Sequence, residues 1–366
     1  MTLEQDIAAA FDLGGQIVHV RPYGHGLIND TFVVSVDTGH RAILQRINRH
    51  VFPRPGQIMD NLRTLTNHTR RHPASDKAAG RELQWPRIFS ARDGKDSVVD
   101  AHGGFWRAMD FVENTYTLET ITDTNQAEEV GFALGRFHAL IHDLDPVRLH
   151  ETLPGFHNAP NYLARFTEAS VRRRETPDNA ELRHCLAFVE AEARQNLADV
   201  LETPRREGKL LISPIHGDTK LNNFLFDAES GRAVSLIDLD TVQPGLIHFD
   251  IGDCLRSCAN PAGESPGNPA AVRFDLDICH AVLKHYFSEA HAFLTPYDQY
   301  YIYDAIRLIP FELGLRFLTD HLEGNHYFKT DRPGHNLHRA LAQFALTSSI
   351  ERNEARIRSL IKGLEA

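Results

Sequence analysis

Cysteine and long apolar runs are both scarce in this sequence. Four cysteines in 366 residues are too few for the disulfide framework of a small secreted scaffold. No apolar run approaches the ~18 residues that a membrane-spanning helix needs. The first residues include Glu4 and Asp6 and lack the basic start and apolar stretch of a secretory signal. We therefore expect a protein of the reducing cytoplasm that has no membrane partner.

Positive charge is also in short supply. The chain has 39 Lys and Arg residues against 49 Asp and Glu residues, which gives a net charge of −10 at pH 7. Such a chain repels a phosphate backbone, so the composition predicts no nucleic-acid partner. A small anionic ligand is still compatible with it, because local donors and a metal ion can outweigh the net charge.

The apolar pattern divides the chain into two parts. Several β-branched runs alternate with turn residues near the N-terminus, at 17–22, 31–37 and 41–47. A helical pattern at 56–72 follows them, and helical patterns dominate the second part. We therefore predict an α+β fold with two lobes, a small β-rich lobe over 1–110 and a larger, mainly helical lobe over 111–366.

The second part contains five long helical patterns, over residues 126–144, 180–201, 271–290, 296–322 and 334–364. Pro310 lies inside the fourth of these patterns and is expected to kink or break it. A compact β-rich patch over 211–240 separates the first two helices from the last three.

That β-rich patch holds the segment with the clearest chemistry, which reads HGDTKLNN over 216–223 and is followed by IDLD at 237–240. It orders Asp218, Asn223 and Asp238 between apolar strands. Phosphoryl transfer needs such a set, because one carboxylate can orient the attacking hydroxyl and accept its proton. An amide oxygen and a second carboxylate are hard ligands that suit Mg²⁺. These residues therefore predict a phosphoryl-transfer site rather than simple turn caps.

A glycine-containing turn, YGHGLIND over 23–30, lies between two predicted strands. Glycines such as Gly24 and Gly26 let the backbone approach a phosphate closely, and His25 lies between them. No Gly-Lys-Ser/Thr follows, so the segment is not a P-loop. Its position ahead of the catalytic-type loop favours a phosphate site over an ordinary hairpin.

Together these motifs resemble those of the aminoglycoside phosphotransferase and choline kinase family, whose fold is protein-kinase-like. The order of glycine turn, third strand, helix, linker, HGD loop and metal aspartate covers almost the whole chain. More narrowly, the chain is similar to the N-acetylhexosamine 1-kinases in the segments GHGLINDTF, ILQRIN, FVENT, HGDTKLNNFLFD, LIDLDTVQPGL, FDIGD and GLRFLTDHLEGNHYFK. This resemblance implies ATP and Mg²⁺ as cofactors and a sugar as the small-molecule partner, phosphorylated on its anomeric hydroxyl.

The resemblance also implies roles for individual residues. Asp218 corresponds to the catalytic base, and Asn223 and Asp238 correspond to the Mg²⁺ ligands. The sugar contacts correspond to Asn29, Asp218, Arg316 and Tyr327. The adenine is expected beside the linker at 106–114, against Asp110, Phe111 and Val112, with the phosphates under the turn of Gly24, His25 and Gly26. We expect a monomer or a weak homodimer.

One position departs from the kinase pattern. The third strand reads AILQRI over 42–47 and lacks the lysine that ordinarily contacts the phosphates. Arg46 is the candidate for that positive charge, with Asp60 as a possible partner, although arginine and lysine are not equivalent. Gln45 points to the other face of the strand, and the sequence alone does not decide which of the two faces ATP.

Two alternatives to a sugar kinase follow. An enzyme of the same fold could act on an aminoglycoside or a choline-type substrate, but a cationic substrate calls for a site lined by carboxylates, and Arg316 argues against it. The missing lysine also raises the possibility of a catalytically inactive, nucleotide-binding scaffold, against which the intact set of Asp218, Asn223 and Asp238 argues.

Overall fold

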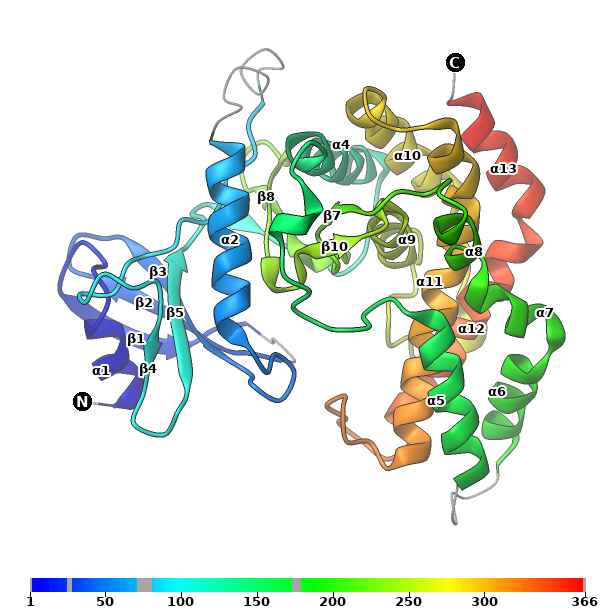
Figure 1. The fold of residues 1–366 in the computed structure, drawn as a ribbon, viewed down its shortest axis with the longest axis horizontal. Coiled ribbons are helices and arrows are strands. Elements are labelled where there is room, and N and C mark those ends of the chain that lie inside the picture. Colours follow the sequence, from blue (N-terminus) through cyan, green and yellow to red (C-terminus); the bar gives the residue numbers. More distant parts are fainter. Residues whose placement is uncertain (1, 25–27, 71–80, 173–178, 365–366) are drawn as a thin grey trace.

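The computed structural model describes residues 2–24, 28–70, 81–172 and 179–364. It has two lobes, with a small sheet-containing lobe beside a larger and mainly helical one (Figure 1). The expected α+β architecture of two lobes is therefore confirmed.

The small lobe is built on a five-stranded antiparallel sheet in the order β1-β2-β3-β5-β4. Its strands are β1 (Ile17–Pro22), β2 (Asp30–Val36), β3 (Arg41–Ile47), β4 (Val98–Val99) and β5 (Phe105–Asp110). Helix α1 (Leu3–Ala9) begins with a capping box at Thr2 and covers one face of the sheet. Even-numbered residues of β3, such as Ala42 and Leu44, pack into that core. The odd-numbered residues therefore face the other way.

Helix α2 (Pro55–Thr69) lies between β3 and β4 in sequence but packs with the large lobe. Ile58, Leu62 and Leu65 on its buried face belong to the same core as the large-lobe helices. The side-chain amide of Asn61 donates to the carbonyl oxygens of His150 and Val242, both at 2.8 Å. The core of the large lobe therefore includes a helix that precedes the expected boundary at residue 110.

The chain passes from the small lobe to the large lobe within a few residues. β5 ends at Asp110, and β6 (Thr115–Tyr116) already pairs with β8 (Phe224–Asp227) of the large lobe. β8 also pairs with β9 (Ala233–Leu236), while β7 (Ser213–Ile215) pairs with β10 (Gln243–Gly245). These short strands hold the HGD and IDLD segments between them.

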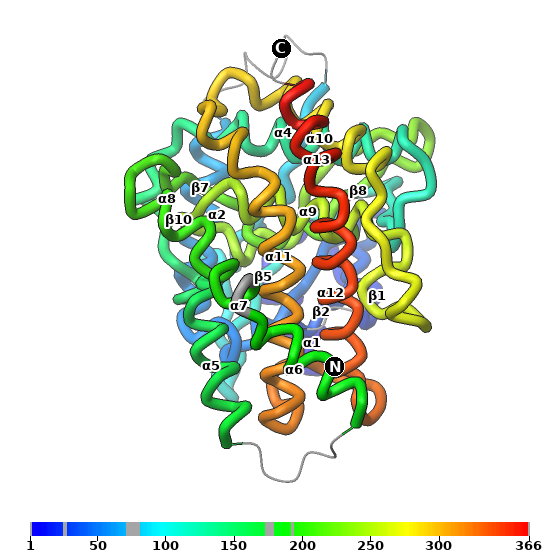
Figure 2. Tube along the Cα trace, turned by 90° about the vertical axis from the view of Figure 1, so that its right-hand side faces the viewer, coloured from blue at the N-terminus to red at the C-terminus, as the bar shows by residue number. Residues whose placement is uncertain are grey.

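The large-lobe helices are α4 (Thr124–Ile141), α5 (Ala159–Arg172), α6 (Ala180–Glu190), α7 (Glu192–Gln195), α8 (Glu202–Arg206), α9 (Ile247–Cys258), α10 (Leu276–Ala290), α11 (Pro296–Glu323), α12 (His335–Arg352) and α13 (Glu354–Gly363). Helix α4 packs against α10, and α11 packs against α9 and α12. Figure 2 shows α11 and α12 running through this layer beside α13.

Three helix predictions need correction. The helix expected over 180–201 breaks at Ala191, whose ψ of 131° is extended, and the one expected over 334–364 breaks at Asn353. Pro310 lies inside α11 without ending it.

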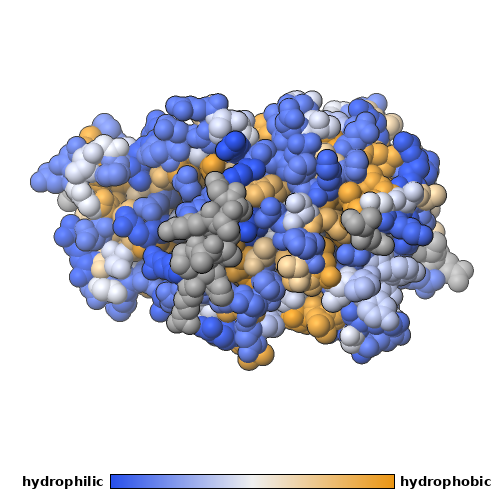
Figure 3. Space-filling model, turned by 90° about the horizontal axis from the view of Figure 1, so that it is seen from above, coloured by the Kyte–Doolittle hydropathy of each residue, from blue (hydrophilic) through white to orange (hydrophobic). Residues whose placement is uncertain are grey.

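The surface seen in Figure 3 is mostly hydrophilic, and hydrophobic side chains form separate patches on it. Among the described residues, no helix is both long enough and apolar enough to cross a membrane.

Candidate active site

The HGD segment forms a loop that a buried carboxylate holds in place. Asp250, in the first turn of α9, accepts hydrogen bonds from the backbone N–H groups of His216 and Gly217 at 2.7 and 2.8 Å. It also accepts one from Nε2 of His138 at 2.9 Å. Gly217 has a φ of +84°, and a Cβ there would lie 2.7 Å from the carbonyl oxygen of Thr241. Only glycine fits this turn.

His216 joins this loop to the segment that follows β9. Its Nε2 donates to the carbonyl oxygen of Ile237 at 3.0 Å, and its Nδ1 accepts the backbone N–H of Asp218 at 3.2 Å. The backbone N–H of Ile237 in turn donates to the carbonyl oxygen of Asn223 at 2.9 Å. Asp218, Asn223 and Asp238 are therefore brought to one place, as the sequence predicted.

Asp218 is half-buried beside Lys220, whose Nζ lies 2.5 Å from its Oδ2. Burial opposes ionisation of the carboxyl group, but the Lys220 ammonium outweighs this effect and lowers the pKa of Asp218. Asp218 is thus an ionised carboxylate at neutral pH. The side-chain amide of Asn223 donates to the carbonyl oxygen of Asp218 at 2.7 Å, which leaves the amide oxygen of Asn223 as a possible ligand.

Asp238 follows Ile237 after the end of β9 and has a left-handed conformation, with a φ of +65°. The residue is open to solvent on one side, yet the protein packed around it and the neighbouring Asp240 carboxylate raise its pKa to about 6. A carboxylate in such a place favours a bound cation. Among the described residues, no group of three or more His, Cys, Asp or Glu forms a metal cage. Mg²⁺ in proteins is usually held by one or two carboxylates together with substrate phosphates.

The third strand directs Gln45, rather than Arg46, toward this region. Gln45 lies opposite Arg107 of β5, and its Oε1 accepts from Nε and Nη2 of Arg107 at 3.1 and 2.7 Å. Nη2 of Arg107 also lies 2.5 Å from Oδ1 of Asp240. The positive charge nearest to the position of the usual lysine therefore comes from the neighbouring strand.

Arg46 is on the opposite face of the sheet, so the structure does not bring it to the other site residues. Its guanidinium lies over the ring of Trp106, 5.9 Å from the centroid, and close to the Asp100 carboxylate, whose pKa is lowered by the indole N–H of Trp106 and, more weakly, by Arg46. Asp60 pairs with Arg63, at 2.8 Å, instead of with Arg46. Strand alternation placed Gln45 and Arg46 on opposite faces, but only the packing of α1 shows which face is which.

The glycine turn is described only in part. Gly24 has a φ of +71° and no atom that would contact an added Cβ within 4 Å, while His25 and Gly26 lie outside the described residues. Nδ2 of Asn29 donates to Oδ2 of Asp240 at 2.8 Å, and its Oδ1 accepts the backbone N–H of Asn48 at 3.0 Å. Asn29 therefore connects the glycine turn to the IDLD segment over 237–240. It does not line the pocket that contains Arg316 and Tyr327.

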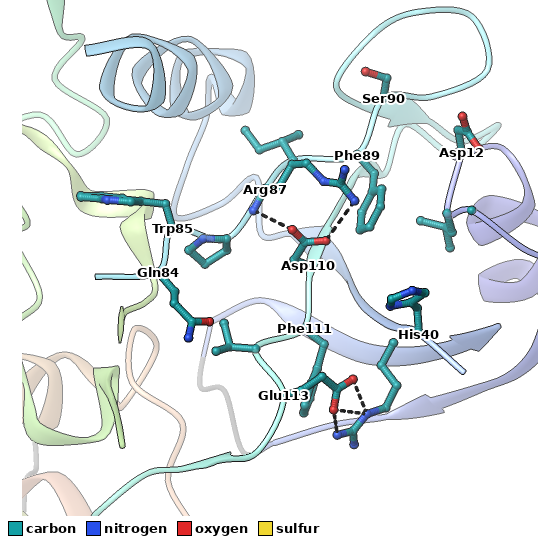
Figure 4. A pocket seen from close by; sticks show the side chains of 16 residues that line it. Asp12, His40, Gln84, Trp85, Arg87, Phe89, Ser90, Asp110, Phe111 and Glu113 are labelled. Atoms are coloured by element: carbon teal, nitrogen blue, oxygen red, sulfur yellow. Dashed lines mark hydrogen bonds and ion pairs between the residues drawn. The ribbon is translucent and has the colours of Figure 1, made fainter. Parts of the chain in front are cut away.

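The linker residues Asp110, Phe111 and Val112 line a pocket of about 900 Å³ at the end of the small sheet (Figure 4). The side chain of Asp110 turns toward Arg87, which lies 3.4 Å away. Arg41 pairs with Glu113 and lies over the ring of Phe111, 4.0 Å from the centroid. The pocket is thus apolar in part and flanked by two ion pairs.

A second pocket, of about 330 Å³, brings Arg316 and Tyr327 together. The Arg316 guanidinium, from α11, lies over four aromatic rings at 5.2–5.8 Å from their centroids, those of Phe156, Tyr162, Tyr327 and Phe328. Burial raises the pKa of Tyr162 to about 12, so its hydroxyl stays neutral. Asp320 fixes the Tyr327 loop by accepting the backbone N–H groups of Tyr327 and Phe328 at 2.8 and 3.0 Å.

His157 connects this pocket to the HGD loop. Its Nε2 donates to the carbonyl oxygen of Gly217 at 3.3 Å, and its Nδ1 lies 3.0 Å from Oε1 of Glu312. Burial disfavours the charged imidazole, but the Glu312 carboxylate prevails and raises the pKa of His157. A protonated ring can donate from both nitrogens. The φ of His157 is +56°, which is an uncommon conformation for a residue with a side chain.

Sequence reasoning assigned no role to Lys220, Arg107, Asp240 or His157. Lys220 lies inside the HGD segment two residues after Asp218, and this spacing could have identified it. Arg107 becomes visible only through strand pairing, because Gln45 and Arg107 are 62 residues apart.

A profile described as the phosphotransferase enzyme family matches residues 19–286 of the chain. Among solved structures, a choline kinase from Cryptosporidium parvum Iowa II has a TM-score of 0.58 at 15% identity, covering 95% of this chain and 93% of that chain. An aminoglycoside phosphotransferase from Alicyclobacillus acidocaldarius has a TM-score of 0.57 at 16% identity, covering 100% and 97%. An amicoumacin kinase in complex with AMP-PNP, Ca²⁺ and Ami has a TM-score of 0.54 at 16% identity, covering 97% and 91%.

Proposed function

Because this chain belongs to the phosphotransferase enzyme family, we propose that it transfers the γ-phosphoryl group of ATP to the anomeric hydroxyl of an N-acetylhexosamine. The chain is a small-molecule phosphotransferase with a kinase-like fold. The choice of nucleotide, metal and acceptor is the part that is proposed. The observation that carries the choice of acceptor is the pocket in which aromatic rings surround Arg316.

The composition of that pocket supports a neutral sugar. Aromatic faces and tyrosine hydroxyls suit the apolar faces and hydroxyl groups of a pyranose, and a guanidinium can donate to an acetamido carbonyl. The two carboxylates in the lining are already engaged, since Asp320 accepts backbone N–H groups and Glu323 lies 3.2 Å from Arg165. A cationic aminoglycoside or choline would therefore meet Arg316 without a free carboxylate among the described lining residues.

Catalysis would depend on the residues around Asp218. The ionised Asp218 carboxylate would orient the acceptor hydroxyl and accept its proton, while Lys220 keeps that carboxylate charged. Asn223 and Asp238 would hold Mg²⁺, which supplies charge neutralisation on the phosphates. Most of the rate would come from positioning and electrostatic stabilisation, with the base as a smaller contribution.

The decisive experiment is an assay of ADP release with ATP and Mg²⁺ across a set of acceptors. We expect turnover with N-acetylglucosamine or N-acetylgalactosamine and none with their methyl glycosides, in which the anomeric hydroxyl is blocked. Choline, ethanolamine and an aminoglycoside serve as the competing acceptors. Preferred turnover of one of these would overturn the sugar assignment, and no turnover of any acceptor despite ATP binding would favour an inactive scaffold.

A further inference from the structure

A buried ion pair links the two lobes at the position where the usual lysine is missing. Arg107, on β5 of the small lobe, is only 1% exposed, and Asp240, in the segment after β9, is only 2% exposed. The guanidinium holds Gln45 on one side and Asp240 on the other, at 2.7 and 2.5 Å. Asn29 of the glycine turn donates to the second oxygen of Asp240. Two small-lobe residues, Arg107 and Asn29, thus contact one carboxylate of the large lobe, and Gln45 supports it indirectly through Arg107.

Stability alone does not account for such a pair. Removing two charges from water is costly, and apolar residues of similar shape often stabilise a protein equally well or better. Nη1 of Arg107 is buried without a hydrogen-bond partner, so the guanidinium is not fully satisfied by its surroundings. An arrangement that keeps a costly and incompletely satisfied charge points to a role in the chemistry of the neighbouring site.

The position of Asp240 indicates what that role is. Asp240 lies two residues after Asp238, and the 3-10 turn of Leu239–Thr241 that contains it begins directly at Asp238. Arg107 is also near enough to Asp238 for its charge to act favourably on that carboxylate. Anything that fixes Asp240 therefore also fixes the conformation of Asp238.

We propose that Arg107 is a positioning residue which, through Asp240, holds the Asp238 segment in the geometry that binds Mg²⁺ and fastens it to the small lobe. Arg107 and Gln45 thus lie where the third-strand lysine is missing, but with a different role from that lysine. Arg107 acts through Asp240 rather than by contact with a phosphate, because its free Nη1 is sealed from solvent. This proposal rests on the proposed phosphotransfer function.

The test uses Arg107→Gln, Asp240→Asn and the double variant of the two. Each single variant leaves one buried charge unpaired and is expected to unfold more easily, whereas the double variant removes both charges and should recover most of the stability. Binding of ADP is measured by calorimetry over a range of Mg²⁺ concentrations and again in EDTA, with adenosine as a ligand that needs no metal. Steady-state rates with N-acetylglucosamine accompany the binding data.

In the double variant we expect the Mg²⁺ concentration for half-maximal ADP binding to rise by about tenfold or more, as for other residues that support metal ligands. Adenosine affinity should stay within about twofold of the wild-type value, because the linker is untouched. A stable double variant with the wild-type Mg²⁺ dependence would show that the pair only supports the fold. Loss of ADP affinity in EDTA for Arg107→Gln but not for Asp240→Asn would instead show direct phosphate contact, and would also overturn the proposal.

Arg46→Gln is the matched control. It removes an arginine from the neighbouring strand β3, at the position next to Gln45 and on the face covered by α1, and should leave Mg²⁺ dependence and turnover unchanged. A wild-type protein that bound no nucleotide would overturn both the proposed function and this proposal. If the wild type bound ADP and the double variant bound it with the same Mg²⁺ dependence, the role of Arg107 would be overturned and the proposed function would stand.

Discussion

His216 and Ile237 are joined by a hydrogen bond from the imidazole Nε2 to the backbone carbonyl oxygen, 3.0 Å long. The bond links the loop that carries Asp218 to the residue directly before Asp238. His216 is fully buried, and burial lowers its pKa, so the ring is neutral and has one donor and one acceptor. His216 therefore positions Asp218 and the IDLD segment that contains Asp238 relative to each other.

Replacing His216 by Ala should reduce both kcat and stability. The change leaves the carbonyl of Ile237 and the N–H of Asp218 without their partner, at about 1–3 kcal/mol for each buried group. We expect a loss of kcat of about tenfold or more and a lower unfolding midpoint, measured by the ADP-release assay and by thermal melting. His142→Ala, at the exposed residue that follows the end of α4, is the control and should change neither. An unaltered kcat in His216→Ala would contradict the positioning role.

Asp218→Asn should remove the base without disturbing the nucleotide. The loss of general-base catalysis and acceptor orientation is expected to lower turnover by about 10²–10⁴-fold. Affinity for MgADP should stay close to that of the wild type. Asp227→Asn, at the half-buried last residue of β8, is the matched control. Normal turnover in Asp218→Asn would reject the assignment of the base.

Asp238→Ala should abolish the dependence of nucleotide binding on Mg²⁺. The variant loses a hard oxygen ligand, so ADP should bind equally weakly with and without the metal. Titration of ADP by calorimetry, with and without Mg²⁺, measures this directly, and adenosine reports whether the rest of the site is intact. If Mg²⁺ still strengthened binding as in the wild type, the ligand role of Asp238 would be wrong.

Arg316→Lys should impair use of the acceptor more than use of ATP. A lysine keeps the charge but loses the planar fork that lies among the four rings. An increase in KM for the sugar of about 10–100-fold corresponds to the roughly 1.5–3 kcal/mol typical of a hydrogen bond to a charged group. The KM for ATP should stay near its wild-type value. Arg165→Lys, at the rim of the same pocket, provides a comparison with a smaller expected effect.

The His157–Glu312 pair should make stability depend on pH. Because the pKa of His157 is raised in the folded protein, its contribution is fully present below the ordinary histidine value of about 6.5. That contribution is lost as pH rises through the raised folded-state pKa. The unfolding midpoint should therefore decline over this range in the wild type and decline less in His157→Gln. Thermal melting from pH 5 to 9 tests the expectation, and parallel curves would refute it.

Local patterns predicted much of the fold because they report local physics. The runs at 17–22 and 41–47 gave β1 and β3 with the observed bounds, since β-branched residues and turn residues mark strands clearly. The helix breaks at Ala191 and Asn353 were missed because neither residue is a strong helix breaker. Pro310 was overestimated because the buried surroundings of α11 support the helix around it.

In the candidate site, too, the residues close together in sequence could be predicted, whereas contacts between distant residues could not. Asp218, Asn223 and Asp238 could be found because their order along the chain reflects one compact loop pair. The structure places Arg46, the candidate for the missing positive charge, on the sheet face that α1 covers, and the position of α1 is not visible in a single strand. Arg107 and Asp240 are 133 residues apart in the sequence (240 − 107), and no local pattern indicates their contact.

The packing of α2 has a consequence for how the molecule could bend. Helix α2 lies between two strands of the small sheet in sequence, β3 and β4, yet its Ile58, Leu62 and Leu65 share the core of the large lobe. If the small sheet rotated relative to the large lobe, α1 would therefore move with the sheet, whereas α2 would stay with the large lobe. The line of bending would run between Ile47 and Pro55, and not only through the linker after Asp110. A fragment that ended at residue 110 would expose the apolar face of α2, so the two lobes are halves of one folding unit.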